Sequence, residues 1–285
     1  MRIQGAPCVG VAPEVSVCVP VYNGARYVAE TMRSILSQSF EDFELIVTDN
    51  CSTDDTVPIV RDFEDPRIRL VVNDANIGAV GNFNKSLREA RGRRVKIVCA
   101  DDLLDPDCLA KQVSALDQND GAVLASCARR VVDHRGRRWI TRGCPSRPGR
   151  LRGGEAVALA IRSGTNVFGE PVAVMMDRDA VVRAGGFSSQ WSYCLDIDLW
   201  CRLLLQGDAV IQKEALCSFR VSPGAWSTEL ASTQAAEFER FVECTLQRDP
   251  TILDAADIDR ALRRARLNGR MRRVFYKVMF ALQSE

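Results

Sequence analysis

Two adjacent carboxylates, Asp101 and Asp102, follow an apolar run at residues 95–100. Hard cations prefer oxygen ligands, and Mg²⁺ or Mn²⁺ commonly lies between one or two carboxylates and the phosphates of a nucleotide. Aspartate is also favoured at helix starts and in turns, so the pair could simply cap the segment that follows. The pair alone therefore leaves two interpretations open, a divalent-metal site and a helix cap.

A second carboxylate cluster, Asp196 and Asp198, introduces another apolar segment. Histidine chemistry has little support, because His134 is the only histidine and stands in a charged stretch typical of a hairpin turn. The eleven cysteines are scattered singly with no CxxC pair, which indicates small buried side chains in a reducing compartment. Acid and base chemistry is therefore expected from carboxylates.

The elements that must position these carboxylates alternate between strands and helices. Strands are predicted at 15–20, 43–48, 68–72 and 95–100, with helices at about 25–37, 54–63 and 78–90 between them. Short connections of this kind are typical of a doubly wound, mostly parallel α/β sheet. Each predicted strand ends in polar residues, and the carboxyl ends of such strands lie along one edge of the sheet, where ligands bind.

The length and composition are those of an ordinary globular protein. The 285 residues are 46% apolar and 26% charged, which excludes a disordered chain, and no stretch reaches the roughly 18 apolar residues of a membrane span. The first residues do not form a signal peptide, so we expect a cytoplasmic protein. We expect a leader at 1–14, a main domain at 15–228 and a helical extension at 229–285.

The second half of the main domain is less regular. We expect a mobile, Gly-, Pro- and Arg-rich loop at 143–154. The other expected elements are a helix at 106–119, a strand at 122–127, a hairpin at 130–140, an ordered apolar segment at 171–176 and a strand at 216–221.

The C-terminal segment is strongly basic. Residues 260–285 carry eight Lys and Arg side chains against Glu285, a charge of +7, so the other residues carry 1 − 7 = −6. The apolar positions Met271, Val274, Phe275, Val278 and Leu282 fall on one face of a predicted helix. Such a helix could lie on anionic lipid as a peripheral membrane contact, or it could dock on the body.

Seven short motifs occur in a fixed order, at residues 17–23, 47–54, 76–78, 99–102, 185–187, 196–203 and 219–221. Together they resemble the family 2 glycosyltransferases, which are inverting enzymes of the GT-A fold. The likeness covers residues 15–228. It implies a Rossmann-like nucleotide-binding half, an acceptor-binding half and C-terminal helices.

The resemblance implies roles for the first four motifs. The nucleoside would be held by Pro20, Tyr22, Asn23 and Asp49, and the pocket would be completed by Asn76, Gly78 and Asn82. Asp101 and Asp102 would bind the ribose and diphosphate through Mn²⁺ or Mg²⁺, which offsets the charge of the leaving group.

The later motifs are implied to serve the sugar and the acceptor. Asp196 occupies the position of the base that deprotonates the acceptor hydroxyl. Asp198 is the alternative base, although it is better placed to cap the following helix. Gly185 and Gly186 would let the backbone approach a sugar, or they form a plain turn, and Trp226 would contact the donor or acceptor sugar.

Two positions depart from the family pattern. Cys99 stands where many members have an aspartate, and Ser222 stands where many have a histidine. Both changes would weaken a metal site. Arg220 remains as a fixed cation that could face the diphosphate.

We therefore predict a metal-dependent glycosyltransferase that moves a sugar, from a UDP-sugar, to a saccharide or lipid-linked saccharide acceptor, as in bacterial surface polysaccharide synthesis. No nucleic acid partner is expected, and a homo-oligomer is left open. A sugar-1-phosphate nucleotidyltransferase is a weaker alternative, because residues 20–26 lack a Gly-rich basic loop. An inactive nucleotide- or glycan-binding module is another alternative. A dehydrogenase is disfavoured because no GxGxxG follows an early strand.

Overall fold

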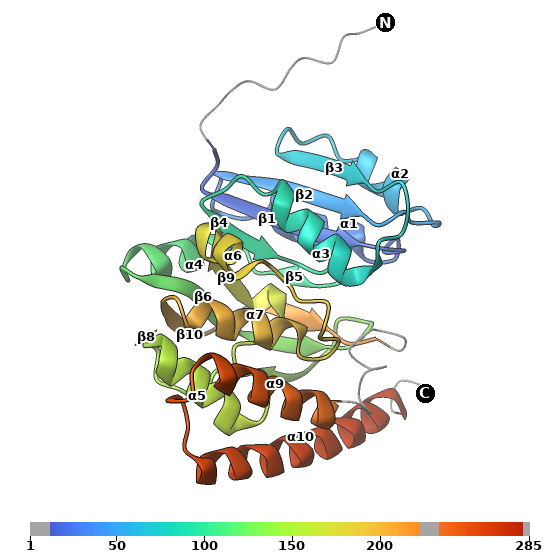
Figure 1. Ribbon diagram of the computed structural model, residues 1–285. Helices are drawn as coiled ribbons and strands as arrows, with labels where there is room; N and C mark the ends of the chain where they lie inside the picture. Colours follow the sequence, from blue (N-terminus) through green and yellow to red (C-terminus); the bar gives the residue numbers. More distant parts are fainter. Residues whose placement is uncertain (1–11, 223–233, 282–285) are drawn as a thin grey trace, which may run out of the picture.

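The computed structural model describes residues 12–222 and 234–281 (Figure 1). Its strands form one sheet in the order β3-β2-β1-β4-β9-β6-β10-β5, with β7 paired to β6 and β8 paired to β10. The strands are β1 (Val15–Val21), β2 (Phe43–Asp49), β3 (Ile68–Val72), β4 (Arg94–Ile97), β5 (Leu103–Leu104), β6 (Ala122–Val132), β7 (Arg138–Arg142), β8 (Gly149–Leu151), β9 (Val174–Asp177) and β10 (Asp208–Arg220).

The first half of the sheet is parallel. β1 lies between β2 and β4, and all seven of its residues are buried because helices cover both faces of the sheet. The near-continuous apolar sequence of β1 follows from this double burial. The parallel pairing brings the carboxyl ends of β1, β2 and β4 to the same edge.

The second half of the sheet is mixed. β9 pairs antiparallel with both β4 and β6, and β6 runs parallel to the long strand β10. The predicted α/β fold with a mostly parallel first half and C-terminal helices is confirmed. In Figure 1 the two halves of the sheet lie above and below one another, with the C-terminal helices at the far end from β3.

The helices form two layers. One apolar cluster lies beneath α1 (Val28–Leu36), α2 (Thr56–Arg61) and α4 (Cys108–Asp117). The other cluster lies beneath the remaining helices, which are α3 (Gly78–Glu89), α5 (Gly153–Ser163), α6 (Arg178–Ala184), α7 (Leu195–Leu204), α9 (Gln234–Arg248) and α10 (Ala255–Ala281). The side chains of β1 alternate between these clusters, with Val17 and Val19 facing one and Cys18 facing the other.

Several predicted boundaries in the second half are wrong. The predicted strand at 122–127 continues to Val132 and pairs with β7, and the predicted loop at 143–154 contains β8 and the start of α5. The ordered apolar segment expected at 171–176 consists of a 3₁₀ turn, η1 (Pro171–Ala173), and the first residues of β9. These segments depend on cross-strand partners distant in sequence, which local periodicity does not report.

The C-terminal helix α10 docks on the body. Ala261, Ala265 and Met279 are buried, and the Asn268 side-chain amide donates to the Ser163 carbonyl at 2.9 Å. The predicted single apolar face is wrong in part, since Phe275 turns inward while the other members described stay exposed, and Leu282 lies outside the described residues. No helix within the described residues is long and apolar enough to cross a membrane.

Candidate active site

A cavity of about 840 Å³ opens at the carboxyl ends of β1 and β4. Its charged lining side chains come from segments far apart in sequence, and they are Arg26, Asp101, Arg129, Arg142, Glu170, Asp196, Arg220 and Arg272. The predicted site residues in the lining are Pro20, Tyr22, Asn23, Asp101, Asp196 and Arg220. The predicted residues outside the lining are Asp49, Asn76, Gly78, Asn82, Asp102, Asp198, Gly185 and Gly186.

Asp101 and Asp102 occupy a turn just after β4, and they have different surroundings. Asp101 is partly exposed to the cavity, and burial raises the pKa of its carboxyl. Asp102 is fully buried behind it, where burial and then the negative charge of Asp101 raise its pKa well above the ordinary value. The Oδ1 of Asp102 accepts from the backbone N–H of Arg220 at 2.9 Å.

The pair fits a divalent cation. The buried Oδ2 of Asp102 has no hydrogen-bond partner among the described residues, which is costly unless a ligand supplies one. No group of three or more Asp, Glu, Cys or His side chains suited to a metal exists in the described part of the chain. Protein ligands would therefore number one or two, as is usual for Mg²⁺ that also binds substrate phosphates.

Arg220, the last residue of β10, ties the aspartate turn to α1. Its guanidinium donates to the Asp101 carbonyl at 2.9 Å and to the Glu30 carboxylate at 2.8 Å. It also stacks on the ring of Tyr27, 4.6 Å from the ring centroid. The side chain is 3% exposed and lines the cavity. Arg220 thus positions the aspartate turn. A ligand could contact the part of its guanidinium that lines the cavity.

The polar residues after β2 and β3 hold the strand ends together. The Oδ1 of Asn76 accepts from the Asn50 amide at 2.8 Å, and the amide of Asn82 donates to the Thr48 carbonyl at 2.8 Å. Asp49 is fully buried, and its Oδ2 accepts from the Ser52 N–H at 2.9 Å. Its Oδ1 is buried with no hydrogen-bond partner among the described residues.

The end of β1 presents Tyr22 and Asn23 to the cavity. Asn23 has a left-handed φ of 51°, which is rare for residues other than glycine and marks a constrained turn. Its backbone N–H donates to the Ser52 hydroxyl at 2.9 Å, and its Oδ1 accepts from the Thr53 N–H at 2.8 Å. The loop after β2 therefore fixes the position of the Asn23 backbone.

Asp196 lies in the first turn of α7 and lines the cavity. Burial, and then the negative charge of Glu170, raise its pKa to about 8, although Arg129 acts in the opposite direction. A carboxylate with a pKa near neutrality is suited to take a proton from a hydroxyl group. Asp196 is thus indicated both by its sequence motif and by its position in the cavity lining.

Asp198, two residues later, is fully buried and ion-paired. Its carboxylate contacts Arg202 at 2.7 Å and Arg248 at 3.1 Å, which joins α7 to α9. The expectation that it caps the helix is wrong, because the N-cap residue is Cys194 and Asp198 lies inside the first turn. These ion pairs hold α7 against α9, which is a structural role.

The glycine pair forms a tight turn after α6. Gly185 and Gly186 have φ values of 78° and 71°, and the Gly186 carbonyl accepts from Arg202 at 2.8 Å. A Cβ on Gly186 would stand 2.5 Å from the Asn84 Oδ1, so a side chain there would displace the Asn84 amide from its hydrogen bonds to Phe187. The geometry matches the plain-turn alternative, and Trp226 lies outside the described residues.

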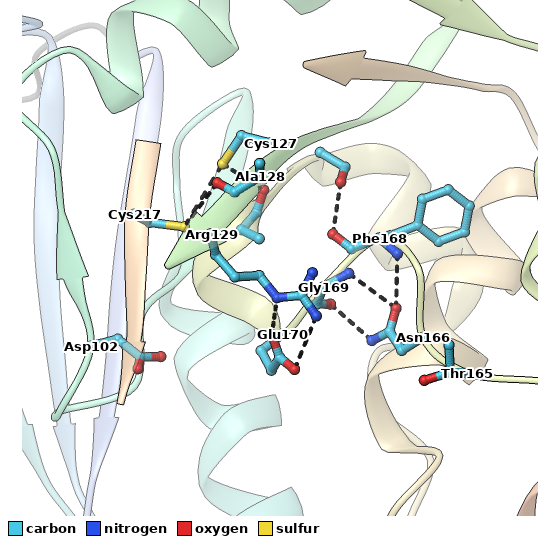
Figure 2. Close-up of polar contacts among 12 residues, drawn as sticks. Asp102, Cys127, Ala128, Arg129, Thr165, Asn166, Phe168, Gly169, Glu170 and Cys217 are labelled. Atoms are coloured by element: carbon cyan, nitrogen blue, oxygen red, sulfur yellow. Dashed lines mark hydrogen bonds and ion pairs between the residues drawn. The ribbon is translucent and has the colours of Figure 1, made fainter. Parts of the chain in front are cut away.

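Sequence reasoning missed the ion pair of Glu170 and Arg129, which Figure 2 shows. Arg129 of β6 is buried, and its guanidinium donates to both carboxylate oxygens of Glu170. Gly169 has a φ of +100°, and a Cβ there would come within 3.2 Å of the Arg129 guanidinium carbon. The sequence offers one signal for this pair, because Glu170 is the only charged residue in the apolar stretch 167–176.

Sequence reasoning also missed the contribution of α10. Arg272 donates to the Thr165 hydroxyl at 2.9 Å, to the Gln234 side chain at 3.1 Å and to the Tyr193 hydroxyl. Arg272 and Phe275 both line the cavity. The C-terminal helix therefore forms part of the cavity wall.

Known proteins resemble this chain over 37–80% of its length. MT1568, an uncharacterized protein of Mycobacterium tuberculosis, is 32% identical over 236 residues, which are 80% of this chain and 73% of that protein. The succinoglycan biosynthesis protein ExoO of Rhizobium meliloti is 34% identical over 111 residues, 39% of this chain and 32% of ExoO. The Escherichia coli enzyme WfgD, a UDP-Glc:alpha-D-GlcNAc-diphosphoundecaprenol beta-1,3-glucosyltransferase, is 34% identical over 106 residues, 37% of this chain and 42% of WfgD.

Solved structures share the fold. Staphylococcus aureus TarS, in complex with UDP-GlcNAc, has a TM-score of 0.69 at 20% identity, covering 90% of this chain and 72% of that one. The mannosyltransferase PcManGT of Pyrobaculum calidifontis, in complex with GDP-Man and Mn²⁺, has a TM-score of 0.64 at 21% identity, covering 94% of this chain and 77% of that one. The sequence model "Glycosyl transferase family 2" matches residues 16–183. The chain thus belongs to glycosyl transferase family 2.

Proposed function

We propose that the protein transfers a sugar from a UDP-sugar to a hydroxyl group of a saccharide or lipid-linked saccharide, with inversion at the anomeric carbon. The observation that carries the proposal is that Asp101 and Asp196 line the same cavity from two different elements. One carboxylate can then serve the leaving diphosphate while the other serves the attacking hydroxyl.

The donor side consists of the strand ends and the aspartate turn. Tyr22 and Asn23 line the nucleotide end of the cavity, and the unpartnered Oδ1 of Asp49 would accept a hydrogen bond from the base. Asp101, backed by Asp102, would hold Mn²⁺ or Mg²⁺. Such a cation, when bound, offsets the charge that develops on the leaving nucleoside diphosphate.

The acceptor side is built around Asp196. Its carboxylate takes the proton of the acceptor hydroxyl as that oxygen bonds to the anomeric carbon and the bond to the diphosphate breaks. The attack comes from the side opposite the leaving group, which inverts the configuration. The side chain of Asp198 is already paired with two arginines, so Asp196 is the base in this proposal. Trp226 remains a proposed sugar contact.

The acceptor is proposed from the relatives. ExoO is named for succinoglycan biosynthesis, and the name of WfgD specifies a saccharide carried on diphosphoundecaprenol. A bacterial surface polysaccharide intermediate of this kind would fit the proposed activity. The free cysteines of the described residues support a reducing, cytoplasmic location.

The donor is tested by thermal stabilisation. A panel of UDP- and GDP-sugars is added with Mn²⁺, and each is repeated with EDTA, because a ligand that binds only the native state raises the melting temperature. We expect a UDP-sugar to stabilise the protein in Mn²⁺ and to lose most of that effect in EDTA. Stabilisation by GDP-sugars alone would overturn the UDP assignment, and equal stabilisation in EDTA would overturn the metal.

A further inference from the structure

The helix α10 has two different faces. Ala261, Ala265 and Met279 are buried against the body. On the outer face, a stripe of apolar side chains spaced at three or four residues stays in solvent. This outer stripe consists of Leu267 (55% exposed), Met271 (58%), Val274 (61%) and Val278 (49%).

The outer stripe carries most of the large apolar side chains exposed in the second half of the chain. Among the described residues after Val182, every exposed large hydrophobic side chain belongs to it. Single exposed apolar residues are ordinary, but four in a row along one helix mark a surface that contacts something else. Within residues 12–222 and 234–281, no segment of the body covers the outer stripe.

Basic side chains border the outer stripe on both sides. At 3.6 residues per turn, Arg264 lies along one border, and Arg263, Arg270 and Lys277 lie along the other. No acidic residue occurs at positions 260–284. Arg263 pairs with Asp259 near the start of the helix, so the excess of positive charge grows toward the C-terminal half. An apolar stripe with a basic row along one border and Arg264 on the other complements a surface that is apolar beneath and negatively charged above.

We propose that the outer stripe of α10 docks in the interfacial plane of an anionic lipid bilayer. The apolar side chains would enter the boundary below the headgroups, and the basic rows would contact the lipid phosphates. A second copy of the chain fits less well, because a symmetric contact through the stripe would bring like-charged rows together. The proposal does not depend on the proposed activity.

Docking through α10 would bring the cavity close to the membrane surface. The inward-facing residues Arg272 and Phe275, on the same helix, line the cavity. An acceptor saccharide carried on a lipid could therefore reach the cavity while its lipid stays in the bilayer. One face of α10 would then contribute to the cavity while the other contacts the membrane.

The test is co-sedimentation of the full chain with lipid vesicles. Vesicles of phosphatidylcholine mixed with phosphatidylglycerol are compared with vesicles of phosphatidylcholine alone. The double variant Met271→Glu/Val274→Glu places carboxylates in the outer stripe. The matched control is Val182→Glu, which changes a side chain of similar exposure (64%) on α6. Circular dichroism and melting temperature confirm that each variant is folded.

We expect the wild type and Val182→Glu to bind the anionic vesicles, with weaker binding at high salt. The double variant should bind at least about tenfold more weakly, while UDP-sugar turnover with a soluble acceptor stays at the wild-type level. Absence of binding by the wild type, or unchanged binding by the double variant, would overturn the proposal. A dimer that the double variant dissociates, without vesicle binding, would also overturn it and assign the stripe to a second copy.

Discussion

The carboxyl groups of Asp196 and Asp198 stand two residues apart in sequence, yet their surroundings give them opposite properties. Arg202 and Arg248 hold Asp198 in an ion pair between helices. Asp196 faces the cavity, where burial and the charge of Glu170 raise its pKa. At the residue scale, the local charges around each carboxylate decide which of them can act as a base.

Glu170 should raise the pH at which the base becomes active, in addition to the larger effect of burial. Asp196 acts when deprotonated, so the rate rises with pH through its pKa, which is about 8. Glu170→Gln removes a nearby negative charge and leaves Arg129, which favours the ionised form. The rising limb of kcat/KM against pH should therefore move to lower pH.

The control for this change is Glu170→Asp, which keeps the negative charge and should keep the rising limb close to that of the wild type. A limb that stays in place in Glu170→Gln, or that moves to higher pH, would show that Glu170 does not act on the base. The measurement is kcat/KM for transfer across the pH range, because this parameter reports the free enzyme.

At the scale of elements, α10 is part of the cavity rather than an appendage. Arg272 connects the helix to Tyr193, before α7, and to Thr165, after α5. The helix therefore fixes two loops that surround the cavity. The predicted boundary at residue 228 stays a prediction, and the contacts of Arg272 argue that both sides of it are needed for activity.

Arg272→Ala should lower kcat/KM for transfer by about tenfold or more, because a hydrogen bond from a charged group contributes roughly 1.5–3 kcal/mol. The loss should exceed that of Arg273→Ala, which removes the neighbouring exposed arginine of the same helix. The melting temperature of each variant is also measured, so that a loss of activity caused by unfolding is recognised. Equal effects of the two variants would show that the cavity contact of Arg272 is unimportant.

The elements that sequence could predict are those with local signals. The strands β1 and β2 were predicted to within one residue, because burial on both faces makes their sequences almost continuously apolar. The strand β10 was predicted at only five of its positions, since its pairing with β6 is interrupted by register shifts. Asp101 and Asp196 were found through motifs, whereas Glu170 and Arg272 reach the cavity only through tertiary packing.

At the scale of the whole molecule, the C-terminal extension differs in charge from the rest of the chain and also packs against it. The C-terminal 26 residues carry +7 against −6 on the rest. The preceding helix α9 packs its aromatic face into the body, with Phe241 against Trp191 at 6.2 Å between ring centroids. Phe238 and Phe241 are almost fully buried. The extension thus contributes to the core as well as to the basic surface.

Truncation after residue 228 should therefore destabilise the fold. It would expose the apolar surface that covers Phe238 and Phe241, and loss of buried aromatic side chains typically costs about 3–5 kcal/mol each. We expect the truncated chain to be largely insoluble or to melt well below the full chain. A soluble truncated chain with the wild-type melting temperature would show that residues 15–228 fold independently.

In the proposed mechanism the cavity has a donor side and an acceptor side, and calorimetry of UDP binding, paired with a transfer assay, tests that division most directly. Mn²⁺-dependent binding of UDP is measured for the wild type, Asp101→Ala and Asp196→Asn, and UDP release from a UDP-sugar in the presence of an acceptor is recorded in a separate assay of the same three proteins. Asp196→Asn should bind UDP as the wild type does while transfer falls by about 10²-fold or more, and Asp101→Ala should lose Mn²⁺-dependent binding. Unchanged Mn²⁺-dependent binding of UDP by Asp101→Ala, or retained transfer by Asp196→Asn, would contradict the account.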